Sequence, residues 1–417
     1  MAAAHDSYLA LRNPGFRRFV VSLMAMTLAT QLRGVVVAWQ LYEATGDPLS
    51  LGLIGLAEAV PFIATALYAG HVADRHDRRR IALAALLLLL GCAAVLLVLS
   101  LRGTPAGAAD VWPFYVVIFA SGIARSFLMP ARTALAAELV PREQYANATA
   151  WRTSSWQFAA VGGPALGGAL YALGGARLAY SVDVALMLVA VAALALVRHA
   201  PRPPAREHVS ITESLSGGLR WVFAQPVILG AMTLDLFSVL FGGAVALLPI
   251  FAADILRAGP QGLGALRAAP AVGSVLTALW LAHRPPMRRA GPAMLASVGV
   301  FGLCIVGFGL SRSLVASLAL LAASGMADTV SVVIRGTLLQ VLTPDALLGR
   351  VSAVNAVFIG SSNEIGAFES GVAAKLMGTV PSVVFGGCMT VLVVAITAWR
   401  IPALRRLRRL DAEASAA

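Results

Sequence analysis

The chain has 417 residues, of which 59% are hydrophobic and 12% are charged. Soluble domains carry about 25% charged residues, so this composition excludes an ordinary water-soluble protein. The formal net charge of +12 could indicate nucleic-acid binding, but the basic residues lie between apolar stretches and do not gather on one face. The composition therefore predicts a membrane protein that crosses the bilayer several times and binds no nucleic acid.

The residue pattern also argues against catalytic or metal-binding chemistry. Cys92, Cys304 and Cys388 lie in separate apolar stretches, and no histidine has a partner at metal-ligand spacing. The sequence contains neither a phosphate-binding loop nor a Ser-His-Asp set. We therefore predict that the protein is not an enzyme and that it holds no metal and no cofactor.

Apolar stretches long enough to cross a bilayer, which takes about 20 residues, occur in two sets of six. The first six predicted helices cover residues 17–41, 50–72, 80–101, 112–137, 145–172 and 178–197. The second six cover residues 226–251, 261–283, 291–310, 314–338, 349–375 and 380–400. The sequence thus predicts twelve transmembrane helices.

The longest polar stretch of the chain separates the two sets of helices. We predict a first six-helix bundle over residues 1–198, a cytosolic linker over 199–220, and a second bundle with a short basic tail over 221–417. Arginines gather before the first helix and in alternate loops, and basic residues of short loops stay on the cytoplasmic side. Both termini are therefore expected in the cytosol. The Arg- and Ala-rich composition is typical of a GC-rich bacterial genome, so the membrane is expected to be the bacterial inner membrane.

An internal repeat supports the division into two bundles. Ser121 realigns with Ser324 at an offset of 203 residues (324 − 121), and the same register aligns Arg132 with Arg335. The register continues, without a gap, through Leu135 and Leu338, Pro141 and Pro344, Gly163 and Gly366, and Gly168 and Gly371. Near the second and eighth helices an offset of 209 (264 − 55) aligns Gly55 with Gly264 and Pro61 with Pro270. Parallel repeats of this kind are typical of secondary transporters.

A charged motif connects the second and third predicted helices. It reads Gly70-His71-Val72-Ala73-Asp74-Arg75-His76-Asp77-Arg78-Arg79-Arg80. The motif resembles the signature loop of the major facilitator superfamily, and the resemblance extends over the whole chain. It implies an all-α membrane fold with twelve transmembrane helices in two pseudo-symmetric six-helix bundles. It also implies a cytoplasmic gate formed by Gly70, Asp74, Arg75, Arg78 and Arg79. Asp77 stands where the family has a second glycine, and the alternative interpretation is a basic loop without a gating role.

The helix predicted over 145–172 carries small residues four positions apart, which let two helix backbones approach, and a proline, which bends the helix. They are Ala159, Gly163, Pro164, Gly167 and Gly168, and Gly366 repeats the phase in the second half. The run is similar to the antiporter motif of exporters; the alternative is an ordinary helix contact. Segments around Trp39, Pro130 and Gly366 look like the drug:proton antiporter branch, which includes enterobactin exporters and macrolide efflux proteins.

Ionisable residues inside the predicted helices are candidates for the transport site, since each costs about 2.5–3.5 kcal/mol at the middle of a bilayer. Two neutral residues, Trp156 and Asn363, are added to these as candidates for the cavity. The complete set of cavity and coupling candidates is Arg33, Glu58, Arg125, Trp156, Asp235, Arg267, Asp328, Asn363, Glu364 and Glu369. The repeat aligns Arg125 with Asp328 and Glu58 with Arg267, so equivalent positions carry opposite charges. We hypothesise that the carboxylates exchange protons while a neighbouring arginine competes for them; the alternative is static ion pairing.

The resemblance implies a secondary active transporter that exports an amphipathic small molecule, a siderophore or a drug, in exchange for protons and by alternating access. A lysophospholipid transporter on the same scaffold is the alternative, and a lateral opening lined by apolar residues would favour it. The expected partners are the small-molecule substrate, protons and membrane lipid. The protein is expected to act as a monomer.

Overall fold

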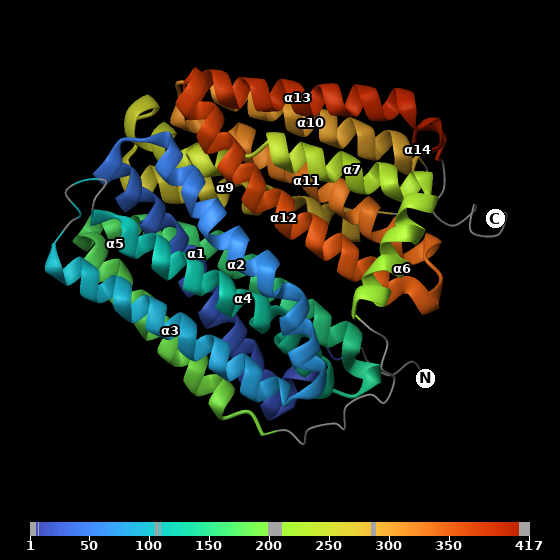
Figure 1. The fold of residues 1–417 in the computed structure, drawn as a ribbon, viewed down its shortest axis with the longest axis horizontal. Helices are drawn as coiled ribbons and strands as arrows, with labels where there is room; N and C mark the ends of the chain where they lie inside the picture. Colours follow the sequence, from blue (N-terminus) through green and yellow to red (C-terminus); the bar gives the residue numbers. More distant parts are fainter. Residues whose placement is uncertain are drawn as a thin grey trace. The chain divides into compact units, whose positions relative to one another are not determined.

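The computed structural model describes residues 6, 8–103, 105, 107, 110–198, 211–284 and 289–407, which are almost entirely helical and contain no strand. The first half holds α1 (Pro14–Thr45), α2 (Pro48–Arg75), α3 (Arg78–Arg102), α4 (Trp112–Glu138) and α5 (Tyr145–Ala195) (Figure 1). The second half holds α6 (Ile211–Ala224), α7 (Pro226–Phe241), α8 (Leu248–Ile250), α9 (Gly259–Ala282), α10 (Ala290–Leu310), α11 (Leu314–Leu342), α12 (Asp345–Met377), α13 (Thr379–Arg400) and α14 (Pro402–Arg406). Short turns of other helix types are η1 (Ala10–Arg12), η3 (Arg142–Gln144), η4 (Ala244–Leu247) and η5 (Phe251–Ile255).

Ten helical segments of the described residues are long and apolar enough to cross a membrane. One of them contains both helices predicted over 145–172 and 178–197, because α5 continues across a kink at Gly174 and Gly175. Gly175 has a φ of 64°, a left-handed conformation that glycine adopts without strain. The helix predicted over 349–375 lies in α12, which is long enough to span but is not among the ten. Its serine, asparagine and glutamate residues lower its hydropathy.

Two predicted segments differ from the structure. The helix predicted over 226–251 is interrupted after Phe241, where Gly242 and Gly243 separate α7 from η4. Two consecutive glycines weaken a helix, which accounts for the break. The predicted linker over 199–220 is helical from Ile211 onward, where α6 begins, and residues 199–210 lie outside the described residues.

The chain divides into two compact units. Unit 1 comprises Met1–Thr45 and Val60–Glu207, and unit 2 comprises Gly46–Ala59 and His208–Ala417. The division passes through α2 between Ala59 and Val60, so the first part of this helix belongs to the unit formed by the later half of the chain. The bundle boundaries at residues 198 and 221 stay a prediction.

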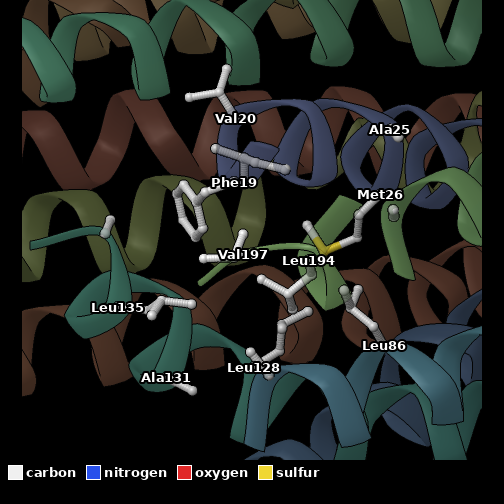
Figure 2. Packing of buried hydrophobic residues seen from close by; sticks show 14 of the residues in the cluster. Phe19, Val20, Ala25, Met26, Leu86, Leu128, Ala131, Leu135, Leu194 and Val197 are labelled. Atoms are coloured by element: carbon white, nitrogen blue, oxygen red, sulfur yellow. The ribbon is translucent and has the colours of Figure 1, made fainter. Parts of the chain in front are cut away.

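The core of unit 1 lies between α1, α3, α4 and the end of α5 (Figure 2). Phe19, Leu23 and Met26 are spaced i, i+4 and i+7, which places them on one face of α1, and all three are buried. They belong to one cluster with Leu86 of α3 and Leu128 of α4. This packing fixes how α1 and α4 present their polar side chains.

Unit 2 has two hydrophobic clusters around α7. One joins α7 to α10, α11 and α14 through Leu234, Met294 and Ile334, among others. The other includes Val222 of α6, which is fully buried with Ile228 of α7 and other apolar residues of α11 and α12. The burial of Val222 explains why the end of the predicted linker folds as a helix against the bundle.

Candidate functional site

The charged motif after α2 is organised around the start of α3. The side chain of Asp77 accepts hydrogen bonds from the backbone N–H groups of Arg79 and Arg80 and therefore caps α3. Asp77 thus replaces the family's glycine with an N-cap. Arg79 donates from its guanidinium to the backbone carbonyl oxygens of Leu194, at 3.4 Å, and Ala195, at 2.5 Å, which ties this motif to the end of α5.

The other predicted gate residues have different surroundings. Arg78 forms an ion pair with Glu138 at the end of α4, a partner that the sequence analysis missed. Arg75 is exposed, and the side chain of Asp74 lies outside the described residues. A Cβ atom placed on Gly70 meets no atom of the described residues within 4 Å, so none of the described helices contacts it closely. The gating role of these residues stays a prediction.

The predicted small-residue seam lies between α5 and α1 of unit 1. A Cβ atom on Gly163 would lie 2.6 Å from Cβ of Gln31, and one on Gly167 would lie 2.8 Å from the carbonyl oxygen of Leu32. Both distances are too short for a real side chain, so only glycine permits this helix contact. Pro164 and Gly168 are buried beside it.

Unit 2 repeats this seam between α12 and α7. A Cβ atom on Gly366 would lie 2.9 Å from the carbonyl oxygen of Leu240 and 3.0 Å from that of Val239. Gly163 and Gly366 are equivalent in the repeat, and α7 of unit 2 corresponds to α1 of unit 1. The seam therefore joins corresponding helices in the two halves.

A buried ion pair holds α1 and α5 together in unit 1. Arg33 donates from Nε to Asp183 Oδ2 at 2.7 Å and from Nη2 to Asp183 Oδ1 at 3.0 Å. Its Nη2 also donates to the carbonyl oxygen of Leu89 in α3 at 3.3 Å. Asp183 has no exposed surface. This bidentate geometry satisfies both charges inside the bundle and makes Arg33 part of a structural pair.

A second buried ion pair joins α7 and α11 in unit 2. Asp235 and Arg335 contact each other, and both side chains are buried. Asp235 was among the predicted site residues, whereas Arg335 was recognised only as the repeat partner of Arg132. The partner could not be read from the sequence, because the two residues are far apart in the chain.

Three further predicted residues come together elsewhere in unit 2. Arg267 of α9 interacts electrostatically with the carboxylates of Glu58, from the first part of α2, and Glu364 of α12. The backbones around the two glutamates are close, since a Cβ atom on Gly55 would lie 2.7 Å from the carbonyl oxygen of Glu364. With all three groups ionised, this charge cluster of Glu58, Arg267 and Glu364 carries a net charge of −1.

The remaining predicted residues do not join one site. In unit 1, the guanidinium of Arg125 lies over the ring of Phe62, 5.8 Å from its centroid. In unit 2, the Asn363 side chain is exposed and donates to the carbonyl oxygen of Ile359 at 2.8 Å. Asp328 and Glu369 are partly buried in α11 and α12.

Trp156, the last predicted residue, lines a pocket in unit 1 with two arginines, Arg132 and Arg152. Sequence analysis did not single out Arg152. The signal was present, because Arg152 and Trp156 are four residues apart and therefore share a face of α5. What sequence reasoning lacked was the position of Arg132, which comes from the packing of α4.

Comparisons with known proteins agree with this fold. The transmembrane secretion effector family matches residues 6–417. The enterobactin exporter EntS of Shigella flexneri is 26% identical over 406 residues, which cover 97% of this chain and 96% of that protein. Among solved structures, a D-xylose–proton symporter superposes with a TM-score of 0.71 at 15% identity, over 94% of this chain and 99% of that one. The human organic anion transporter MFSD10 gives a TM-score of 0.64 at 17% identity, over 94% and 100% of the two chains.

These similarities confirm the predicted resemblance and the all-α major facilitator fold. Both solved structures are similar at the level of the fold, and the family match extends over nearly the whole chain. The chain therefore belongs to the transmembrane secretion effector family, a family of major facilitator transporters.

Proposed function

We propose that the protein is a secondary transporter of the bacterial inner membrane that exports a siderophore-like small molecule in exchange for protons. The observation that carries this proposal is the similarity to the enterobactin exporter of Shigella flexneri, which covers 97% of this chain and 96% of the exporter. The similarity extends over nearly the whole length of both proteins, so it does not depend on one helix or one half alone. In this proposal both termini lie in the cytosol, as the distribution of arginines suggests.

The charge cluster of Glu58, Arg267 and Glu364 is the proposed site of proton exchange. Arg267 interacts electrostatically with both carboxylates, so protonation of either glutamate would remove one of these two attractions. Proton binding and release at this cluster would change the attraction of α2 and α12 to Arg267. That change is a means of linking protonation to helix movement.

Alternating access is supported by the repeated construction of the two halves. Each half has a glycine-dependent helix contact, α1 with α5 and α7 with α12, along which helices can move without separating bulky side chains. The ion pair of Arg78 with Glu138 and the cap at Asp77 are proposed to hold the cytoplasmic gate in one of the two states.

Transport into inverted membrane vesicles tests this proposal. Vesicles containing the protein are given an acidic interior, and uptake of radiolabelled enterobactin is compared with that of a lysophospholipid. We expect enterobactin to accumulate only while the proton gradient is present, and the lysophospholipid not to accumulate. Enterobactin uptake that survives collapse of the gradient would refute proton exchange.

Variants of the charge cluster extend this test. Glu58→Gln and Glu364→Gln are expected to abolish gradient-driven accumulation while leaving downhill exchange of enterobactin measurable. Glu143→Gln, which removes an exposed carboxylate in η3, is the matched control and should transport normally. If both cluster variants accumulate substrate as the wild type does, the cluster only holds the helices together.

A further inference from the structure

A pocket in unit 1 has a composition that the proposed proton exchange does not use. Its volume is about 220 Å³. Its lining residues come from α1, α4 and α5, and they are Phe19, Leu23, Arg132, Thr149, Arg152, Thr153 and Trp156. Phe19 and Leu23 are buried in the core of unit 1. These two side chains form the apolar wall of the pocket, and their packing in the core holds them in place.

One face of α5 forms the polar side of this pocket. Thr149, Arg152, Thr153 and Trp156 follow the spacing i, i+3, i+4 and i+7, which aligns them along two turns of the helix. Two hydroxyl groups, a guanidinium and an indole ring therefore point in nearly the same direction. Trp156 is 46% exposed, so part of its indole ring is free to contact a ligand.

The two arginines of this pocket have no carboxylate partner among the described residues. Arg132 is repelled electrostatically by Arg152 and by Arg125. Among the described side chains, no carboxylate forms an ion pair or hydrogen bond with Arg132 or Arg152. Placing two guanidinium groups together without an acid raises the free energy of the folded state. A bound anion would remove this cost.

Unit 2 shows what the same arginine does when an acid is present. Arg335, the repeat equivalent of Arg132, is buried against Asp235 of α7. Asp235 is nine residues after the first residue of α7 (235 − 226), and the residue nine after the start of α1 (23 − 14) is Leu23. Leu23 lines the pocket beside Arg132. The acid that neutralises the arginine in unit 2 is thus a leucine in unit 1.

We infer that this pocket binds the acidic group of an aromatic organic acid. The guanidinium groups of Arg132 and Arg152 bind the carboxylate or a similar oxyanion, for which their planar donors are suited. The ring of the acid stacks on Trp156 and packs against Phe19 and Leu23. The volume of about 220 Å³ is smaller than the roughly 300–1,000 Å³ of a complete small-molecule site. The pocket therefore holds one charged ring of a larger molecule.

Binding can be measured without transport, so its failure is distinguishable from failure of the proposed function. The probes are 2-naphthoate, its neutral analogue 2-naphthamide, and inorganic phosphate, titrated into the full-length protein in phosphatidylcholine nanodiscs. We expect 2-naphthoate to bind at least tenfold more tightly than either of the other two. Because all three probes are tested on the wild-type protein, a misfolded variant cannot account for the difference.

Variants then place the binding in this pocket. Arg132→Gln with Arg152→Gln is expected to weaken 2-naphthoate binding at least tenfold, and Trp156→Ala about fivefold. Arg142→Gln removes an exposed arginine from the same unit and is the matched charge control, expected within twofold of wild type. Circular dichroism and gel filtration check that each variant is folded. Trp156→Ala, which leaves the charges in place, provides a second route if the double variant does not fold.

Three results would overturn the inference. The first is binding of 2-naphthamide or of phosphate as tight as that of 2-naphthoate. The second is unchanged 2-naphthoate binding in both folded pocket variants. The third is loss of 2-naphthoate binding when the nanodiscs contain phosphatidylglycerol, because this would assign the two arginines to a lipid headgroup.

Discussion

Arg132 in unit 1 and Arg335 in unit 2 stand at equivalent positions of the repeat, but their surroundings differ. Arg335 is buried and paired with Asp235, so it joins α7 to α11. Arg132 faces a pocket with Arg152, and Leu23 occupies the position that corresponds to Asp235. The exchange of an acid for a leucine thus separates a structural ion pair in unit 2 from a guanidinium in unit 1 that has no carboxylate partner among the described residues. Duplicated halves can therefore keep a residue and change its role through its neighbour.

The largest expected effect comes from breaking the pair in unit 2. Asp235→Asn leaves the guanidinium of Arg335 buried without a counter-charge, which costs about 3–5 kcal/mol in buried pairs. We expect a large decrease in the unfolding temperature of the detergent-solubilised protein, measured by loss of the monodisperse gel-filtration peak. Combining Asp235→Asn with Arg335→Gln should recover part of the loss. An unchanged unfolding temperature for Asp235→Asn would show that the pair contributes nothing to stability.

The glycine-dependent helix contacts of the two halves should be equally sensitive to substitution, whereas the two arginines should not be. A Cβ atom on Gly163 or Gly366 would overlap a neighbouring helix, and overpacking typically costs about 1–3 kcal/mol. Gly163→Ala and Gly366→Ala should therefore lower the unfolding temperature by similar amounts. At Gly162 the added atom would lie 3.6 Å from Cδ2 of Leu28, an ordinary contact, so Gly162→Ala is the matched control. Equal effects of Gly162→Ala and Gly163→Ala would contradict this account.

Installing the missing acid in unit 1 tests the comparison directly. Leu23→Asp places a carboxylate beside Arg132, where unit 2 has Asp235. We expect it to compete with the probe for the guanidinium groups and to weaken 2-naphthoate binding about tenfold, which is about 1.4 kcal/mol. Leu23→Asn, which is similar in size but uncharged, should weaken binding less, and isothermal titration calorimetry distinguishes the two. Equal affinities of the two variants would argue against an anion site.

The smallest effect is expected at an exposed pair. Lys375 Nζ lies 2.6 Å from Asp47 Oδ2, and the two side chains are 52% and 32% exposed. Surface pairs contribute about 0–1 kcal/mol, so Lys375→Gln should hardly change the unfolding temperature. Burial raises the pKa of Asp47, but hydrogen bonds from Lys375 and from the backbone of Leu49 outweigh it and lower the pKa. The contribution of Asp47 is therefore present above about pH 4 and lost as the pH falls through its folded pKa. The difference in unfolding temperature between the wild type and Lys375→Gln should therefore stay constant between pH 6 and 8.

Much of this fold was predictable from the sequence, because apolar length and the 203-residue repeat are local or periodic signals. The repeat even aligned Arg132 with Arg335. It could not show that Asp235 lies beside Arg335, since this contact depends on the packing of α7 on α11. The break after Phe241 was predictable in principle from the adjacent Gly242 and Gly243. The helix at Ile211 was obscured by the polar residues that precede it.

The candidate site was harder to predict than the fold, because the partners of its charged residues also depend on how the helices pack. Equivalent positions of opposite charge suggested that Glu58 and Arg267 were related by symmetry. In the structure they interact electrostatically, and Glu364 joins them because the first part of α2 packs on α12. Conversely, Arg33 was predicted as a cavity residue but is held by Asp183 and Leu89. In both instances the outcome depends on which helices are neighbours.

The division of α2 between the two units has a consequence for any attempt to cut the protein in two. Residues 46–59 belong to unit 2, where Gly52 lies against Gly371 and Gly55 against Ala367. A fragment that ends before α6 would carry this half-helix away from its packing partners. If the two fragments were expressed from split genes, the second fragment would therefore lack residues 46–59 of its own unit and would need the first fragment in the same membrane to supply them.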